Sequence, residues 1–138
     1  EENLNDIAGV RIVCSFTSDI YRLADMIGRQ SDITVLSIKD YIKNPKPSGY
    51  KSYHMIVTIP IFLSDRMVDT KVEIQIRTIA MDFWASLEHD IRYKADKSRL
   101  PEGINEEMLA VSGKIADIDR QMQDMYLRIR AAETEKDE

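Results

Sequence analysis

Polar side chains recur at every second position over residues 71–77, a spacing that could set up chemistry on one face of a strand. The polar members are Lys71, Glu73, Gln75 and Arg77, and the apolar members, which we expect to face the core, are Val72, Ile74 and Ile76. Because successive side chains of a strand point to opposite faces, the polar members lie about 6.6–6.8 Å apart on one face. The alternation by itself also fits a face exposed to solvent. Glu73 stands between two basic residues, however, which favours its ionised form and suits a Mg²⁺ ligand or a general base, and Arg77 suits a phosphate.

A lysine-rich loop upstream of this strand predicts a site for phosphate groups. Residues 39–51 contain four lysines and one aspartate, so this short segment has a net charge of +3. The lysines that can reach phosphate oxygens are Lys39, Lys43, Lys46 and Lys51. Gly49 lets the backbone turn, Tyr50 offers a flat face for a nucleobase, and His54 can hydrogen-bond a phosphate or a ribose hydroxyl. His54 taken alone would fit a structural histidine better, so the prediction rests on the combination.

A second carboxylate, Asp6, stands just before the first apolar strand and could join Glu73 at a hard cation. By itself Asp6 also fits a turn or capping residue. Two carboxylates, several lysines and a stacking tyrosine together fit metal-assisted transfer of a phosphate group. A zinc site is not predicted, because the single cysteine, Cys14, and the histidines His54 and His89 form no cluster at metal spacing.

Composition limits the class of protein. The 138 residues fit one domain, and 43% hydrophobic with 31% charged residues is ordinary for a globular chain. The net charge of −5 argues against general binding of nucleic acids, since the basic charge is confined to the loop. No apolar run approaches the roughly 20 residues that span a bilayer, and no signal-peptide core is present. We therefore expect a cytoplasmic protein without a membrane or nucleic-acid partner. Because the chain begins with Glu1 and enters a strand almost at once, we also expect further residues upstream.

Hydrophobic periodicity predicts an α/β (α+β) fold, a mixed β-sheet flanked by helices. The predicted strands span residues 10–16, 33–38, 53–61 and 68–77. The predicted helices span about 18–28, with Ser18 as the N-cap, then 79–93 and 105–130. In the middle helix the apolar residues in i, i+4 register are Ile79, Phe83, Leu87 and Ile91.

The last predicted helix carries a heptad seam of apolar residues. Its members are Met108, Val111, Ile115, Ile118, Met122, Met125 and Ile129. Such a seam is typical either of packing within the subunit or of contact between subunits, and both interpretations stay open here. Residues 131–138 are charged, lack the seam and are predicted to fray. We thus expect a core over residues 1–95, a helix over 104–130 that packs on the core or on a partner subunit, and a charged tail over 131–138.

Four motifs, in this order, resemble the synthetase domain of the RelA/SpoT family. They are Asp6-Ile7-Ala8-Gly9-Val10-Arg11, Gly49-Tyr50-Lys51-Ser52-x-His54, Glu73-Ile74-Gln75-Ile76-Arg77-Thr78 and Trp84-Ala85-x-x-Glu88-His89. Residues 38–46 fit as well, and the resemblance covers roughly residues 1–95. The compact chain is similar to small alarmone synthetases of the RelQ type.

This resemblance implies a nucleotidyltransferase-like synthetase fold and GTP pyrophosphokinase activity. The β,γ-pyrophosphate of ATP would move to the ribose 3′-hydroxyl of GTP or GDP, giving (p)ppGpp and AMP for stringent-response signalling. It implies Mg²⁺ as the cofactor, with Asp6 and Glu73 as its ligands and Glu73 also as the base. It also implies a homotetramer and, since no hydrolase motif is present, no breakdown of the alarmone.

The same resemblance implies roles for the other site residues. Tyr50 would stack on guanine, Lys46 and His54 would contact acceptor phosphates, and Arg11 would flank the adenine of ATP. The rest of the implied acceptor set is Lys39, Lys51, Ser48, Gln75 and Arg77, where Ser48 stands at a position that is usually asparagine in long family members. The family's basic segment for ATP phosphates lies upstream of Asp6, so we expect residues 1–138 by themselves to make little alarmone. The alternative function is a non-catalytic guanine-nucleotide-sensing or oligomerisation module, which the intact carboxylates disfavour.

Overall fold

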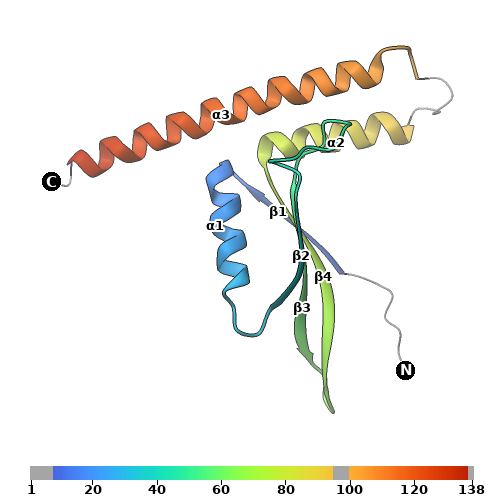
Figure 1. Ribbon diagram of the computed structural model, residues 1–138, viewed down its shortest axis with the longest axis vertical. Coiled ribbons are helices and arrows are strands. Elements are labelled where there is room, and N and C mark those ends of the chain that lie inside the picture. Colours follow the sequence, from blue (N-terminus) through green and yellow to red (C-terminus); the bar gives the residue numbers. More distant parts are fainter. Residues whose placement is uncertain (1–7, 95–99, 137–138) are drawn as a thin grey trace.

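A mixed sheet and a pair of long helices make up the fold (Figure 1). The computed structural model describes residues 8–94 and 100–136. The strands are β1 (Ala8–Cys14), β2 (Thr34–Asp40), β3 (Tyr53–Phe62) and β4 (Met67–Thr78), and the helices are α1 (Thr17–Gly28), α2 (Ile79–Lys94) and α3 (Ile104–Lys136). The predicted fold class is confirmed, and within the described residues no helix is long and apolar enough to cross a membrane.

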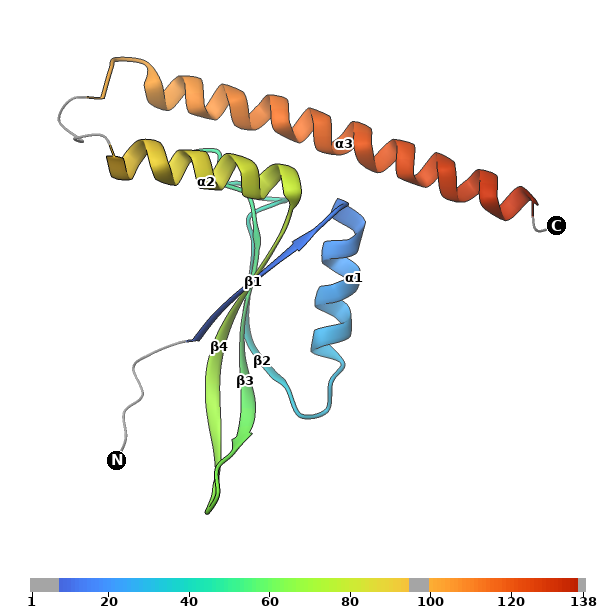
Figure 2. The ribbon, with the colours of Figure 1, turned by 180° about the vertical axis from the view of Figure 1, so that it is seen from behind.

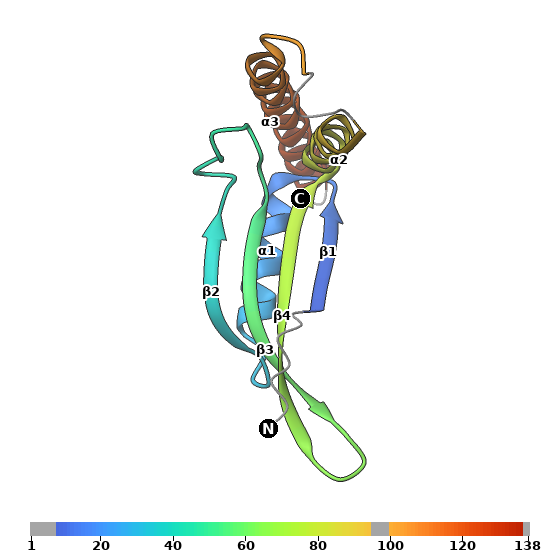
Figure 3. The same ribbon diagram turned by 90° about the vertical axis from the view of Figure 1, so that its right-hand side faces the viewer.

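The sheet has the strand order β1-β4-β3-β2 (Figure 3). β1 runs parallel to β4, whereas β3 is antiparallel to both β4 and β2. The register places Arg11 opposite Gln75, Gln75 opposite His54, and His54 opposite Lys39. Side chains opposite one another share a face, so these four residues form one polar row across the whole sheet.

The other face of the sheet is buried under α1, which lies behind the strands in Figure 3. Ile20 and Ala24 of α1 pack in the same cluster as the apolar residues of β3 and β4. On β4 these are Val72, Ile74 and Ile76, which are 8%, 6% and 0% exposed. The predicted alternation along this strand is therefore confirmed.

Helices α2 and α3 lie side by side across one end of the sheet (Figures 1 and 2). The predicted i, i+4 stripe of α2 does not face the core, because Ile79, Phe83, Leu87 and Ile91 are 62%, 58%, 46% and 40% exposed. The buried residues are instead Met81, Trp84 and Ala85. The reason lies at the start of the helix, which follows β4 without a loop and is capped where Thr78 Oγ1 accepts from Met81 N at 3.1 Å. The end of the strand thus fixes which side of α2 meets α3, and Trp84 Nε1 donates to Met108 O at 3.0 Å.

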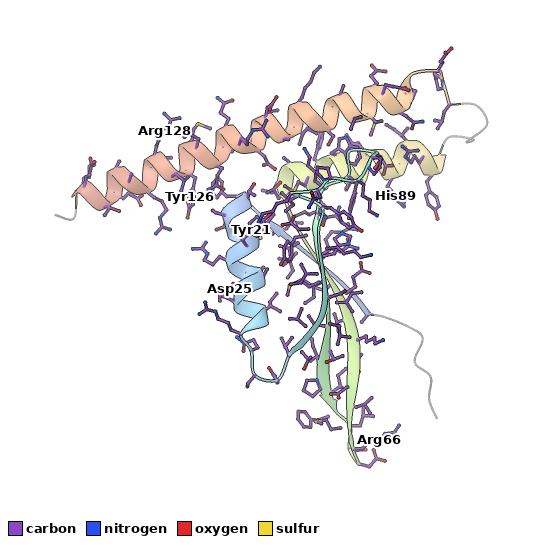
Figure 4. All side chains as sticks on the ribbon, in the orientation of Figure 1. Tyr21, Asp25, Arg66, His89, Tyr126 and Arg128 are labelled. Carbon is purple, nitrogen blue, oxygen red and sulfur yellow. The ribbon has the colours of Figure 1, made fainter. Side chains whose placement is uncertain are left out.

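The start of α1 also differs from the prediction. Phe16 is the N-cap residue and makes no side-chain cap, so the assignment of Ser18 as N-cap was wrong. Ser18 bonds Gln123 of α3 instead, with Ser18 N donating to Oε1 at 3.0 Å and Nε2 donating to Ser18 Oγ at 3.1 Å. Phe16 stacks on Tyr126 with ring centroids 4.2 Å apart, and Figure 4 shows Tyr126 on the side of α3 that faces α1. A contact from a distant helix replaces the local cap.

Helix α3 packs on the domain through polar residues rather than through the whole predicted seam. Ser112 and Asp119 are buried, whereas four seam residues, Val111, Ile118, Met122 and Ile129, are 38%, 55%, 44% and 59% exposed. The helix continues to Lys136, so residues 131–136 of the predicted frayed tail are helical. Ala131, Ala132 and Glu133 are good helix formers, which explains this extension.

Candidate functional site

The open face of the sheet, opposite α1, carries the polar row Arg11, Gln75, His54 and Lys39. Glu73 lies on the same face one step along β4 and pairs with Ile56 of β3 and Gly9 of β1. The alternation along β4 thus places Glu73 and Gln75 on the same face as His54 of β3 and Lys39 of β2. A rigid sheet holds all of them, which suits a site that needs fixed geometry.

A first pocket of about 430 Å³ lies over this face, and we call it the loop pocket. Its lining residues are Ser37, Lys39, Tyr41, Lys46, Tyr50, His54, Ile56, Glu73 and Gln75. Six residues predicted from the sequence therefore come together here. The volume lies within the range of about 300–1,000 Å³ that is usual for small-molecule sites.

The lysine loop, residues 41–52, forms one wall of the loop pocket and is held by local hydrogen bonds from Asp40 and from its own backbone. Asp40 Oδ1 accepts from the N–H groups of Ile42 and Lys43 at 2.9 and 3.0 Å. Gly49 N donates to Lys46 O at 2.8 Å, and Gly49 has a φ of +98°, a conformation that other residues adopt at a cost. These bonds set the turn that presents Tyr50 to the pocket.

Two aromatic rings lie near the cation of Lys46. Its Nζ lies 4.8 Å from the ring centroid of Tyr41 and 5.3 Å from that of Tyr50, within the range of cation–π attraction. Tyr41 also meets His54 edge-on at 5.1 Å. Sequence reasoning did not single out Tyr41, although an aromatic residue among four lysines was a usable signal.

His54 links the loop to the carboxylate of Glu73. Its Nε2 lies 3.0 Å from Tyr50 Oη, and its Nδ1 lies 3.5 Å from Glu73 Oε1. Burial lowers the pKa of His54, Glu73 opposes this shift, and Lys46, Arg77 and Lys39 add to it. A lowered pKa keeps the imidazole neutral at pH 7, so His54 can offer one donor and one acceptor.

A second pocket, also of about 430 Å³, adjoins the first, and we call it the arginine pocket. Its lining residues are Arg11, Tyr50, Gln75, Arg77, Ala85, Ser86, Glu88, His89 and Asp90. Tyr50 and Gln75 line both pockets, so the two spaces meet at these side chains. Glu88 and His89, from the fourth sequence motif, reach this pocket from α2, where Figure 4 labels His89.

Arg77 is buried, with 3% of its side chain exposed, and it supports the junction of the two pockets. Its Nη2 donates to Gln75 Oε1 at 2.6 Å and to Tyr50 Oη at 3.4 Å. Its Nη1 lies 3.5 Å from Asp82 Oδ1, which is also 3.8 Å from Arg11 Nη1. Sequence reasoning missed Asp82, which joins the two arginines from the first turn of α2.

Several predicted site residues lie elsewhere. Lys51 points away from the loop pocket, and its Nζ donates to Ser112 O of α3 at 3.5 Å. Ser48 acts within the loop, where its Oγ accepts from Tyr50 N at 3.4 Å. Lys43 Nζ lies 5.4 Å from the ring centroid of Tyr21 on α1. Asp6 lies outside the described residues.

Glu73 is the carboxylate that lines the loop pocket. Over residues 8–94 and 100–136, no group of three or more His, Cys, Asp and Glu side chains is placed to hold a metal ion. Mg²⁺ is commonly held by one or two carboxylates together with substrate phosphates, so a pocket with one carboxylate suits this ion better than a zinc-like cluster would.

Comparisons with known proteins agree with the motifs. The family described as "Region found in RelA / SpoT proteins" matches residues 1–98. GTP pyrophosphokinase YwaC of Bacillus subtilis is 50% identical over 108 residues, which are 78% of this chain and 51% of that protein. GTP pyrophosphokinase YjbM of the same organism is 37% identical over 132 residues, 96% of this chain and 62% of that protein.

The fold has matching relatives among solved structures. The crystal structure of small alarmone synthetase 1 from Bacillus subtilis bound to its product pppGpp aligns with a TM-score of 0.82 and 36% identity. The alignment covers 94% of this chain and 65% of that one. The chain thus spans between about half and two thirds of the length of these relatives. With its sequence motifs, its sheet and most of its length matched, the chain belongs to the RelA/SpoT family.

Proposed function

We propose that the protein is a GTP pyrophosphokinase, which transfers the β,γ-pyrophosphate of ATP to the ribose 3′-hydroxyl of GTP or GDP and releases AMP. The observation that carries this proposal is the pair of pockets that meet at Tyr50 and Gln75. A transfer between two nucleotides needs two adjacent sites, because both reacting groups must be held in contact. The names of YwaC and YjbM and the pppGpp bound to small alarmone synthetase 1 support the same activity.

The loop pocket is the site for the guanine nucleotide in this proposal. The ring of Tyr50 stacks on guanine, while the exposed lysines Lys39 and Lys46 contact its phosphates. Neutral His54 adds a hydrogen bond to a phosphate or ribose oxygen. Gln75 lies where the two nucleotides meet.

The arginine pocket is the site for ATP. Arg11 lines it, and a guanidinium can stack on adenine or bind phosphate. Arg77 stays beneath the junction and holds Tyr50 and Gln75 in place. Because the two pockets adjoin, the β-phosphate of ATP lies next to the ribose of the acceptor in this proposal.

The chemical step needs a base at the acceptor 3′-hydroxyl. Glu73 accepts that proton while the 3′-oxygen bonds to the β-phosphorus of ATP. The bond between the β-phosphorus and the α,β-bridging oxygen breaks, and AMP leaves with that oxygen. Glu73 and Asp6 are the carboxylates that would hold Mg²⁺, which neutralises phosphate charge when it is bound.

One assay tests the activity. The intact protein is incubated with ATP, GDP and Mg²⁺, and AMP and the guanine product are measured together. We expect AMP in equal amount to a guanine nucleotide that has gained two phosphates. Release of ADP, or of AMP at the same rate without GDP, would contradict the proposal.

The outer side of α3 supports a homo-oligomer, for which we propose the homotetramer implied by the family. Ile118 and Met122 on this side are 55% and 44% exposed. Replacing both with glutamate should reduce the particle size in light scattering while far-ultraviolet circular dichroism stays unchanged. A wild-type protein that is already monomeric would contradict the proposal. A cytoplasmic location also stays a prediction.

A further inference from the structure

The lysine loop has a second contact surface, on the side away from the loop pocket, where it meets α3. Ser112 of α3 is 5% exposed, and its Oγ donates to Gly49 O at 2.5 Å. Lys51 Nζ donates to the carbonyl oxygen of the same Ser112 at 3.5 Å. Two groups on either side of Tyr50 are thus bonded to a single residue of a helix more than sixty positions away in sequence.

This contact is tight at Gly49. A Cβ added to Gly49 would lie 2.8 Å from Ser112 Cβ and 3.3 Å from Leu109 Cδ1. A separation under about 3 Å forces one of the two backbones to move, because both atoms are fixed close to their main chains. The loop and the helix are therefore in direct contact at Gly49 and Ser112, and both positions need a small residue.

Lys51 is partly buried between the loop and α3. It lines a cavity of about 130 Å³ between the loop and α3, together with Asp119 and Arg120. Burial lowers the pKa of Lys51, Arg120 adds to this shift, and Asp119 opposes it. Asp119 is itself 8% exposed and accepts a hydrogen bond from Thr78 Oγ1 at 2.6 Å. The same side of α3 thus bonds both the lysine loop and the end of β4, next to Arg77.

We propose that Ser112 and Lys51 are positioning residues, which set Tyr50 for the guanine base through the backbone at Gly49, and that Lys51 does not contact phosphate. This inference rests on the proposed function, because it takes the loop pocket as the guanine-nucleotide site. It also separates Lys51 from Lys46, which is close in the loop but lines the loop pocket itself.

The two roles differ in how affinity depends on the number of phosphates. Removal of a lysine that contacts phosphate weakens the binding of GTP more than the binding of GMP, since charge-assisted hydrogen bonds to phosphate are lost. A residue that positions the ring acts on base stacking, which is common to GMP, GDP and GTP. Its removal should weaken all three nucleotides by the same factor.

The experiment measures dissociation constants of GMP, GDP and GTP by calorimetry with the intact protein. Ser112→Ala and Lys51→Met should each weaken all three nucleotides by about tenfold, the effect expected when one hydrogen bond that holds the loop against α3 is lost. Lys46→Met should weaken GTP more than GMP. Ser64→Ala in the turn between β3 and β4 is the matched control and should bind like the wild type. A non-hydrolysable ATP analogue should lose much less affinity than the guanine nucleotides in Ser112→Ala and Lys51→Met, because Tyr50 lines the arginine pocket without stacking on adenine in the proposed function.

Three other outcomes would overturn the inference, and a fourth would refute the proposed function. A loss in Lys51→Met that grows with every added phosphate would assign Lys51 to phosphate and overturn the inference, as would Ser112→Ala with wild-type affinity. If Ser112→Ala does not fold, Gly49→Ala takes its place, because its added Cβ pushes the loop from α3, and unchanged affinity there overturns the inference too. A wild-type protein that binds none of the three nucleotides would refute the proposed function itself, which separates the two failures.

Discussion

The two faces of the central sheet are built from the same strands, but one face is apolar and buried and the other is polar and open. On β4, Val72, Ile74 and Ile76 are buried against α1, while Glu73, Gln75 and Arg77 point to the two pockets. β3 does the same with Met55 on the buried face and His54 on the open face. Period-two alternation thus separates the core from the proposed site at neighbouring positions. Substitutions on the open face should impair the reaction and leave folding intact, and those on the buried face should do the reverse.

The largest effect on the open face is expected for Glu73→Gln. The amide keeps the shape of the side chain but loses the charge and the base that we propose for the reaction, so synthesis by the intact protein should fall by at least about 10², the low end for a general base. Affinity for GDP and the melting temperature should change little. Glu133→Gln, on the exposed end of α3, is the control. Near-normal turnover in Glu73→Gln would remove this residue from the chemical step.

On the buried face, Met55→Ala should lower stability without directly affecting the site. Met55 is 1% exposed and lies opposite Ile74 in the core. Truncation of such a residue costs about 2–5 kcal/mol, which denaturant unfolding measures. The control is the same change at Met67, which is 56% exposed. Its stability should stay within about 0.5 kcal/mol of the wild type, as is usual for surface substitutions. If Met55→Ala loses turnover while its stability is unchanged, the two faces are not separable.

Tyr50→Ala tests the open face at the loop pocket. Loss of one base stack costs about 1–3 kcal/mol, so KM for GDP should rise roughly 5- to 150-fold. KM for ATP should change much less. Tyr50→Phe keeps the ring but not the hydroxyl that faces His54 and Arg77, and it should retain most of the affinity. Equal losses for both nucleotides in Tyr50→Ala would mean that the side chain serves only the structure.

Local pattern predicted much of this arrangement, because alternation and turn chemistry depend on neighbouring residues. The strands, the buried face of β4 and the turn at Gly49 all followed from such signals. Contacts between distant segments could not be predicted in this way. Only the packing of α3 shows that Lys51 faces away from the loop pocket although Tyr50, beside it, faces inward. The exposed stripe of α2 has the same cause, since the direct junction with β4 decides which side of that helix is buried.

The smallest expected effect concerns His54, which belongs to the open face yet is half-buried. Burial lowers its pKa in the folded state below the value of about 6.5 in an unfolded chain. Between these two values the unfolded chain binds more protons, so stability should be complete above about pH 6.5 and should fall as the pH drops toward the folded-state pKa. Denaturant unfolding between pH 7.5 and 5 measures the slope. His54→Gln should flatten it, whereas His89→Gln, at an exposed histidine of α2, should keep it. A slope that is the same in the wild type and in His54→Gln would show that His54 adds nothing to the pH dependence of stability.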